Sequence, residues 1–206
     1  MTGLLLPGQR QPEPGTGTLL SVNVGRARDL PGAGRSAIGK VAVDGPVRVA
    51  TLGLDGDEQA DRRHHGGVDK AVYAYAWETL RAWEALLERS LWPGALGENL
   101  TTLGIDVDGA LLGEVWEVGT CLLEVRGPRT PCRKLSVAMD RPSLRREFLA
   151  AGRPGAYLAV LGEGVVRAGD AVHVVFRPTD APSVAQVFRK SAGTRRRSAM
   201  PQPTPV

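Results

Sequence analysis

The chain of 206 residues contains only two cysteines, Cys121 and Cys132, and three histidines. Two cysteines are too few for a disulfide framework, and so few cysteines and histidines make a structural zinc site with four protein ligands hard to assemble. The chain does not open on a basic segment followed by an apolar run, and no stretch approaches the length of a membrane span. We therefore expect a reduced, cytoplasmic protein without a membrane association, in which a thiol stays available for chemistry.

The charge of the chain is mildly basic, with a formal net charge of +4 and an isoelectric point of about 9.4. Part of the excess lies in the tail at Arg195, Arg196 and Arg197. Such a charge would suit an anionic small ligand or nucleic acid, and plain solubility explains it better than nucleic-acid binding does. The sequence shows no recognition helix, zinc finger or RNA-binding motif, so we expect no nucleic-acid partner.

The turn-forming residues, 26 Gly and 15 Pro, favour short strands over a helical bundle. Seven or eight strands and two helices can be recognised, and alternating strand–helix–strand units are missing, so a β-barrel-like core with inserted helices is predicted. Residues 1–17 are predicted to form a flexible leader, 18–177 the domain, and 178–206 a short helical remnant followed by a flexible basic tail. The strands are expected at 19–24, 47–52, 71–76, 111–118, 120–126, 156–161 and 171–176, with a loop at 31–39.

Each of the two expected helices has its own sequence signals. In the first, at 77–89, apolar residues recur at a spacing of three to four, and Glu78 and Arg81 form an i,i+3 pair on the opposite face. The second, at 140–151, has Asp140 as its N-cap and Gly152 as its C-terminal stop. The apolar face of the first helix consists of Trp77, Leu80, Trp83, Leu86 and Leu87.

The segment around Cys132 is the first of three polar stretches whose residues could bind a ligand or take part in a reaction. Pro128 and Pro131 restrict its backbone, and the neighbouring Arg129, Arg133 and Lys134 would stabilise a thiolate. A thiolate is a soft ligand that suits a transition metal or persulfide chemistry. Burial of a small residue at a strand end is an equally good explanation of this cysteine alone. Cys121, within an apolar strand, is interpreted as a core residue.

The other two polar stretches lie upstream. Residues 55–70 have no hydrophobic period over an unusual length, and they bring His64 and His65 next to two glycines among alternating charges. Such a loop could bind a phosphorylated ligand, or it could be a charge-balanced surface loop. The stretch Gly97-Glu98-Asn99-Leu100 offers a carboxylate and an amide, which a turn cap would explain equally well.

Taken together and in order, these motifs resemble the MOSC family, named after the C-terminal domain of molybdenum-cofactor sulfurase, and in particular its stand-alone bacterial members of the YiiM type. The resemblance extends from about Thr18 to about Phe176. Four motifs in register are far more specific than any one of them. They are Gly56-Asp57 with Gln59-Ala60-Asp61, then His65-Gly66-Gly67 with Asp69-Lys70-Ala71-Val72-Tyr73, then Gly97-Glu98-Asn99-Leu100, then Pro128-Arg129-x-Pro131-Cys132-x-Lys134-Leu135.

The resemblance implies a mostly-β, barrel-type domain that binds a molybdenum cofactor (molybdopterin). Cys132 takes the position of the family cysteine, which is associated with direct molybdenum ligation or with sulfur carriage, and it is therefore the implied catalytic residue and metal ligand. A further set of residues would line the site of the pterin and its phosphate. These are Gln59, His65, Lys70, Asn99, Arg129 and Lys134.

The implied activity is a reductase that acts on N-hydroxylated bases or related small molecules. The chain has neither a cysteine pattern for an iron–sulfur cluster nor a dinucleotide fingerprint, so the electrons would come from an external electron-transfer protein. One alternative is a sulfur transferase in which Cys132 carries a persulfide from a cysteine desulfurase. The sulfurase link connects the family to pyridoxal phosphate, but this chain has no domain for that cofactor. A non-catalytic carrier of the molybdenum cofactor is the other alternative.

The C-terminal region departs from the YiiM pattern. Relatives of this type carry a helical extension after the barrel, and Ser183-Val184-Ala185-Gln186-Val187 is similar to its beginning. Because the chain then turns to Arg, Ser and Pro, a short, truncated C-terminal helix is expected. A homodimer is expected as well, although a dimer contact through this extension would then be in doubt.

Overall fold

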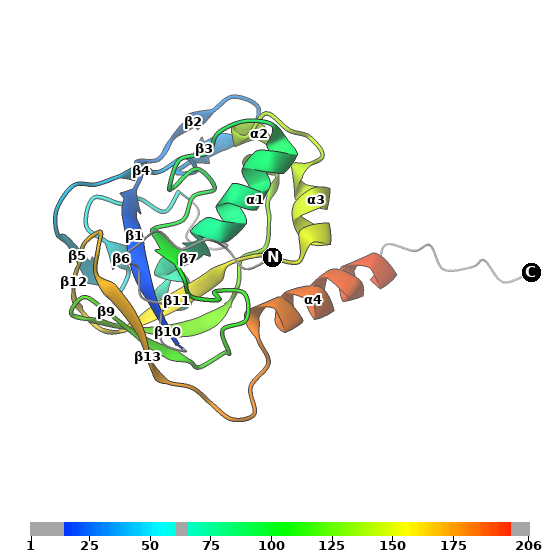
Figure 1. Ribbon diagram of the computed structural model, residues 1–206. Helices are drawn as coiled ribbons and strands as arrows, with labels where there is room; N and C mark the ends of the chain where they lie inside the picture. Colours follow the sequence, from blue (N-terminus) through cyan, green and yellow to red (C-terminus); the bar gives the residue numbers. More distant parts are fainter. Residues whose placement is uncertain (1–14, 61–65, 199–206) are drawn as a thin grey trace, which may run out of the picture.

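The structure, a computed structural model, describes residues 15–60 and 66–198. Seven strands close into a barrel (Figure 1). Neighbouring strands run antiparallel, apart from one parallel pair. In order around the barrel the strands are β13 (Ala171–Phe176), β9 (Val115–Val118), β10 (Cys121–Pro128), β11 (Ala156–Gly162), β7 (Val72–Ala76), β8 (Leu100–Leu103) and β1 (Thr16–Val24), which pairs again with β13.

The barrel core follows from the alternation of side chains along the strands. In β10, Cys121, Leu123 and Val125 are fully buried, while the residues between them point outward. The prediction that Cys121 is a core residue is thus confirmed. Strand β7 differs because all five of its residues are buried. Its alanines and Val72 face the barrel core, and its tyrosines, Tyr73 and Tyr75, face a second core outside the barrel.

The second core lies between the barrel and the helices. Trp83 donates a hydrogen bond from its indole N–H to the Tyr75 hydroxyl at 2.8 Å, and its ring stacks on Phe148 with centroids 5.6 Å apart. Phe148 in turn meets the edge of Phe188. This core joins helices that are far apart in the sequence on one side of the barrel (Figure 1). The helices are α1 (Trp77–Leu87), α2 (Arg133–Ala138), α3 (Leu144–Ala151) and α4 (Val184–Ser198).

Between β1 and β7 the chain makes several short excursions. The expected loop at 31–39 contains half of a hairpin, in which β2 (Arg28–Leu30) pairs with β3 (Gly34–Ser36). The excursions place Ser36 and Asp57 beside the end of the barrel that bears the cavity described below. The remaining short elements are β4 (Val41–Ala42) on β1, a small sheet of β12 (Gly164–Val166), β5 (Val47–Ala50) and β6 (Gly53–Leu54), and the 3-10 helix η1 (Val68–Lys70).

The mostly-β, barrel-type fold predicted from the sequence is confirmed, and the helices bring corrections. The second expected helix begins at Leu144 with Ser143 as its N-cap, because Asp140 adopts a left-handed conformation (φ 46°) that ends the preceding turn. A further, unexpected helix, α2, follows Cys132 directly. In α1, Arg81 pairs with Glu84 rather than Glu78, whose carboxylate accepts a hydrogen bond from Gly104 N–H at 2.7 Å.

The two ends of the described structure also differ from expectation. Strand β1 begins at Thr16 and pairs with β13 from there, two residues before the expected boundary. Helix α4 is longer than a truncated remnant, since it spans 15 residues and includes Arg195, Arg196 and Arg197. Val184 and Phe188 anchor it in the two cores. Flexibility was also expected for residues 1–14 and 199–206, which lie outside the residues that the structure describes. None of the described helices is long and apolar enough to cross a membrane.

Candidate functional site

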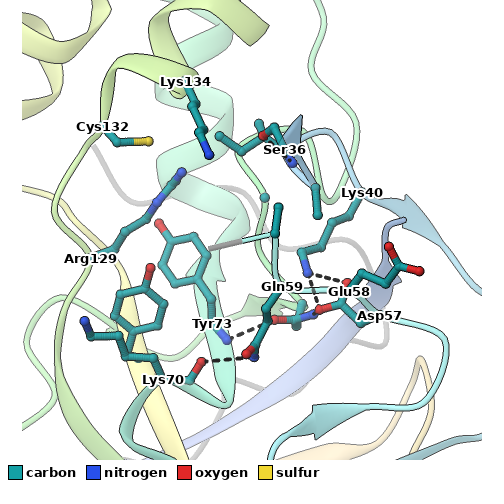
Figure 2. Close-up of a pocket in the computed structure, with 16 residues that line it drawn as sticks. Ser36, Lys40, Asp57, Glu58, Gln59, Lys70, Tyr73, Arg129, Cys132 and Lys134 are labelled. Atoms are coloured by element: carbon teal, nitrogen blue, oxygen red, sulfur yellow. Dashed lines mark hydrogen bonds and ion pairs between the residues drawn. The ribbon is translucent and has the colours of Figure 1, made fainter. Parts of the chain in front are cut away.

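One cavity brings the three polar stretches together at the end of the barrel where β10 ends and β7 and β11 begin (Figure 2). Six of the seven residues predicted for the site line it: Gln59, Lys70, Asn99, Arg129, Cys132 and Lys134. The seventh, His65, lies outside the described residues. The structure thus places distant motifs side by side, although their binding roles stay predictions.

Strand pairing explains why these motifs converge. Tyr157 of β11 lies opposite Tyr73 of β7, and Pro128, the last residue of β10, lies opposite Ala156. Arg129 leaves β10 at that point and therefore enters the space beside the two tyrosines. The parallel pairing of β7 with β8 adds the third motif, because Asn99 directly precedes β8 and its backbone N–H donates to the Tyr73 carbonyl at 2.8 Å.

Cys132 occupies the N-cap position of α2 with an extended backbone (φ −107°, ψ 169°). Its thiol makes no capping hydrogen bond, and the residue is partly exposed behind a buried Pro131. The sulfur points into the space that also receives the ends of Arg129 and Lys134 (Figure 2). A thiol presented in this way is available as a soft ligand or nucleophile.

Arg129 is a buried cation, with 4% of its surface exposed. Its guanidinium donates to the Leu96 carbonyl at 2.6 Å and lies 5.0 Å from the centroid of the Tyr73 ring. Burial acts to lower the pKa of Arg129, but Tyr73, Tyr157 and Cys132 outweigh it, so the pKa is raised and the charge is kept. Burial raises the pKa of Tyr73, whose neutral hydroxyl donates to the Pro154 carbonyl at 2.8 Å.

A buried ion pair between Lys40 and Asp57 forms the opposite wall of the cavity. The side chains are only 7% and 3% exposed, and Lys40 Nζ reaches both carboxylate oxygens. Asp57 also accepts hydrogen bonds from Gly25 N–H at 2.8 Å and from Asn99 Nδ2 at 2.9 Å. Burial lowers the pKa of Lys40, and the Asp57 carboxylate opposes that shift.

Asn99 and Gln59 brace the walls of the cavity through hydrogen bonds within the protein. Asn99 accepts from Tyr73 N–H at 3.2 Å through Oδ1, and its Nδ2 donates to Asp57 and to the Asn23 carbonyl. Gln59 Nε2 donates to the carbonyls of Leu52 and Ala71 at 3.2 and 3.4 Å. The side-chain N–H groups of both residues and the Asn99 Oδ1 are therefore engaged in hydrogen bonds that hold the cavity in shape.

Below Asn99, the carboxylate of Glu98 is fully buried. It accepts hydrogen bonds from Gly94 N–H at 2.6 Å, Leu96 N–H at 3.1 Å and the Thr101 hydroxyl at 3.3 Å. Burial raises the pKa of Glu98 to about 7, because these hydrogen bonds and the nearby Arg129 offset only part of the cost of removing the charge from water. Glu98 thus organises the loop whose Leu96 carbonyl receives Arg129.

The cavity as a whole is positively charged. Its lining contains four cationic side chains, those of Lys40, Lys70, Arg129 and Lys134, and two carboxylates, those of Asp57 and Glu58. Lys134 Nζ donates to the Arg35 carbonyl at 2.7 Å, and Lys70 Nζ lies 5.9 Å from the centroid of the Tyr157 ring. One thiol among fixed cations and aromatic rings suits an anionic ligand that carries a soft metal or a reactive sulfur.

Sequence reasoning did not assign Lys40, Ser36 or Tyr157 to the site. Lys40 follows an apparent loop, and Tyr157 belongs to an ordinary strand, so neither carries a local signal of function. The resemblance motif included Asp57 and Tyr73 but gave them no role. Only the closed barrel shows that these residues share a cavity with Cys132.

Comparisons of the sequence and of the structure with known proteins indicate the same family. Residues 61–173 match the MOSC domain. Protein YiiM of Escherichia coli is 34% identical over 164 residues, which cover 78% of this chain and 73% of that protein. A "Reductase" of Gibberella moniliformis is 36% identical over 184 residues, and the match spans 33% of its length. The crystal structure of YiiM from Geobacillus stearothermophilus superposes with a TM-score of 0.73 at 33% identity and covers 87% of this chain and 85% of that one.

Proposed function

Because the chain belongs to the MOSC-domain family, which includes proteins that bind the molybdenum cofactor, we propose that it binds this cofactor through Cys132 and works as an oxidoreductase. The observation that carries the proposal is the lining of the cavity. It brings the thiol of Cys132 together with four cationic side chains. The Gibberella relative named a reductase supports redox chemistry in the same family.

The residues of the cavity fit the cofactor chemically. A cysteine thiolate is a soft donor suited to a transition metal, and it can take a single open position. Lys70, Lys134 and Arg129 offer N–H donors for an anionic phosphate, for which charge-assisted hydrogen bonds are the strongest available. The rings of Tyr73 and Tyr157 form an apolar wall between them, which suits a flat heterocycle.

The reaction that we propose is reduction of an N–OH bond. One N-hydroxylated molecule takes up two electrons and two protons, the N–O bond breaks, and an amine and water result. When bound, the cofactor would supply the two-electron centre. Cys132 would hold it from one side, and Lys70, Arg129 and Lys134 would hold its phosphate. Lys40 Nζ holds a proton beside Asp57 in this cavity, and burial lowers its pKa. The electrons come from a separate electron-transfer protein.

Activity with a chemical electron donor tests this function. The protein is purified from a host that makes molybdenum cofactor and is mixed with an N-hydroxylated base and reduced methyl viologen. We expect conversion to the amine by wild type and by Cys121→Ala, and its loss in Cys132→Ala. Equal rates for the two cysteine variants would contradict the proposal. Bound cofactor with no turnover of any N-hydroxylated compound would favour the non-catalytic carrier.

Persulfide transfer is the second candidate, favoured by the partial exposure of Cys132. The thiolate of Cys132 would attack the terminal sulfur of a desulfurase persulfide, form a new S–S bond and release the desulfurase thiolate. Mass spectrometry after incubation with a cysteine desulfurase and cysteine measures this directly. One added sulfur on Cys132, without bound molybdenum, would support the transferase. The matches lend no support to a pyridoxal-phosphate link, and the cytoplasmic location and homodimer stay predictions.

A further inference from the structure

A second depression reaches Cys132 from outside the barrel, between α2 and α3. We call it the α2–α3 groove. The two helices lie side by side, away from the small β5–β6–β12 sheet (Figure 1). Cys132 lines both this groove and the cavity at the end of the barrel, so the two adjoin at this residue. The groove is lined by Pro131, Cys132, Arg133, Ser136, Val137, Asp140, Arg141, Pro142 and Arg145.

The charge of the groove is positive. Its lining contains three arginines and one carboxylate, that of Asp140. The guanidinium of Arg141 is held by Glu147 through two hydrogen bonds of 2.8 and 2.9 Å. Arg133 and Arg145 are exposed and have no ion pair within residues 15–60 and 66–198. These two cations are therefore available to a partner.

Helix stability does not explain these two arginines. Arg133 is the first residue of α2, and Arg145 is the second residue of α3. Cations at the start of a helix oppose its dipole, which favours negative charge there. The first turn of α2 contains no acidic residue that would compensate, and Glu147 in the first turn of α3 is held by Arg141. The dipoles of these helices therefore do not account for the two positions.

The shape of the groove suits a protein partner better than a small molecule. Its apolar part, made by Pro131, Val137 and Pro142, is bordered by exposed arginines, the arrangement of a protein interface with a charged rim. Ser136 is its buried polar side chain, and Ser136 Oγ already accepts a hydrogen bond from Arg145 N–H at 3.2 Å. Among the residues that line the groove, a small ligand would find only this one buried hydroxyl to fix its orientation.

From these observations we infer that the α2–α3 groove is the docking surface for an acidic electron-transfer protein, an inference that rests on the proposed function. Each turnover needs two electrons from such a carrier, which is oxidised while the N–O bond of the substrate is reduced with two protons. Cys132 lines the groove and also lines the cavity in which the cofactor would bind, so a partner in the groove would lie next to the redox centre. Carboxylates of the partner would pair with Arg133 and Arg145 in a weak, salt-sensitive encounter.

The test compares two double variants that remove the same charge. Arg133→Ala/Arg145→Ala changes the groove, and Arg48→Ala/Arg167→Ala changes two exposed arginines on β5 and after β12, away from α2 and α3 (Figure 1). The probe is an acidic plant-type [2Fe–2S] ferredoxin. Its affinity is measured by fluorescence anisotropy, with the purified chain and at several salt concentrations, so that this readout needs no activity. Circular dichroism verifies the fold of each variant.

We expect the groove variant to bind ferredoxin about tenfold more weakly, with a shallower salt dependence, and the control variant to bind like wild type. Because Arg133 adjoins Cys132, turnover is compared with Arg145→Ala alone: turnover driven by reduced ferredoxin should fall, whereas turnover driven by reduced methyl viologen should stay unchanged. Equal affinities of the groove and control variants would overturn the docking site, as would an equal loss of viologen-driven turnover. If viologen drives no reduction even in wild type, the proposed function fails instead, and the anisotropy result still decides the docking site.

Discussion

Lys40 and Asp57 form an ion pair that is almost completely buried at the wall of the cavity, and they come from two excursions that separate β1 from β7. Asp57 receives hydrogen bonds from Gly25 N–H and Asn99 Nδ2 in addition to the Lys40 ammonium. The pair therefore links three segments of the chain that line the site. Each charge is removed from water and depends on the other for compensation.

This dependence predicts a strong coupling between the two residues. Asp57→Asn keeps an acceptor for Gly25 N–H but leaves the Lys40 charge buried without a counterion, and we expect it to lower the free energy of unfolding by about 3 kcal/mol. Lys40→Met combined with Asp57→Asn should recover part of that loss, since no charge stays buried. Urea denaturation of the single and double variants gives the coupling energy. Strictly additive effects would contradict the proposed pairing.

The raised pKa of Glu98 predicts a pH dependence of stability. The carboxyl has a pKa of about 7 in the folded protein against an ordinary value of 4.5, so the folded state binds more protons between these pH values. Stability contributed by Glu98 is therefore complete below pH 4.5, is lost as pH rises to about 7, and stays level above it, with a total of about 3 kcal/mol. Glu98→Gln should remove this slope from denaturation curves measured between pH 4.5 and 8.

Asp108 provides the comparison for that experiment. Burial raises its pKa to about 6, so Asp108→Asn should remove a slope confined to lower pH. If wild type and Glu98→Gln keep the same slope between pH 6 and 7, the assignment of the pH dependence to Glu98 is wrong.

Gly94 predicts a steric effect on the same wall. It has a φ of +93°, and a Cβ at this position would lie 2.6 Å from the Lys40 carbonyl oxygen, which also accepts a hydrogen bond from Trp92 Nε1 at 2.9 Å. Gly32 has a similar φ of +75° with nothing within 4 Å. Both alanine variants carry the cost of the left-handed backbone, so their difference isolates the clash. We expect Gly94→Ala to cost about 2 kcal/mol more in thermal or urea denaturation; equal costs would show that the wall can move aside.

The residues of the site that belong to short sequence motifs could be predicted from the sequence. Gln59, Lys70, Arg129 and Cys132 each belong to a short stretch with few alternatives, and the order of the stretches pointed to one shared cavity, where the structure places them. Lys40 was missed because its partner, Asp57, lies 17 residues away and only the folded chain brings them together. A single lysine after a glycine loop carries no pattern.

The strands whose buried and exposed side chains alternate could be predicted from the sequence. The helices whose presence or length depends on tertiary packing could not. Strand β10 alternates cleanly and was expected, whereas α2 has only six residues and too few turns to show a helical period. Asp140 was expected as the N-cap of α3, but Ser143 occupies that position, because the left-handed backbone of Asp140 ends the preceding turn. Helix α4 has a polar sequence, but Val184 and Phe188 anchor it in the cores, so packing extends a helix that composition alone did not predict.

The molybdenum and pterin content of the purified protein tests the central claim most directly. Protein from a cofactor-producing host is analysed by elemental mass spectrometry and by fluorescence of the oxidised pterin, for wild type, Cys132→Ala and Cys121→Ala. Cys121 is a buried barrel residue and serves as the matched control for the loss of one sulfur. We expect molybdenum in wild type and Cys121→Ala and its loss in Cys132→Ala. Wild type without molybdenum, or a Cys132→Ala variant that retains it fully, would contradict the account.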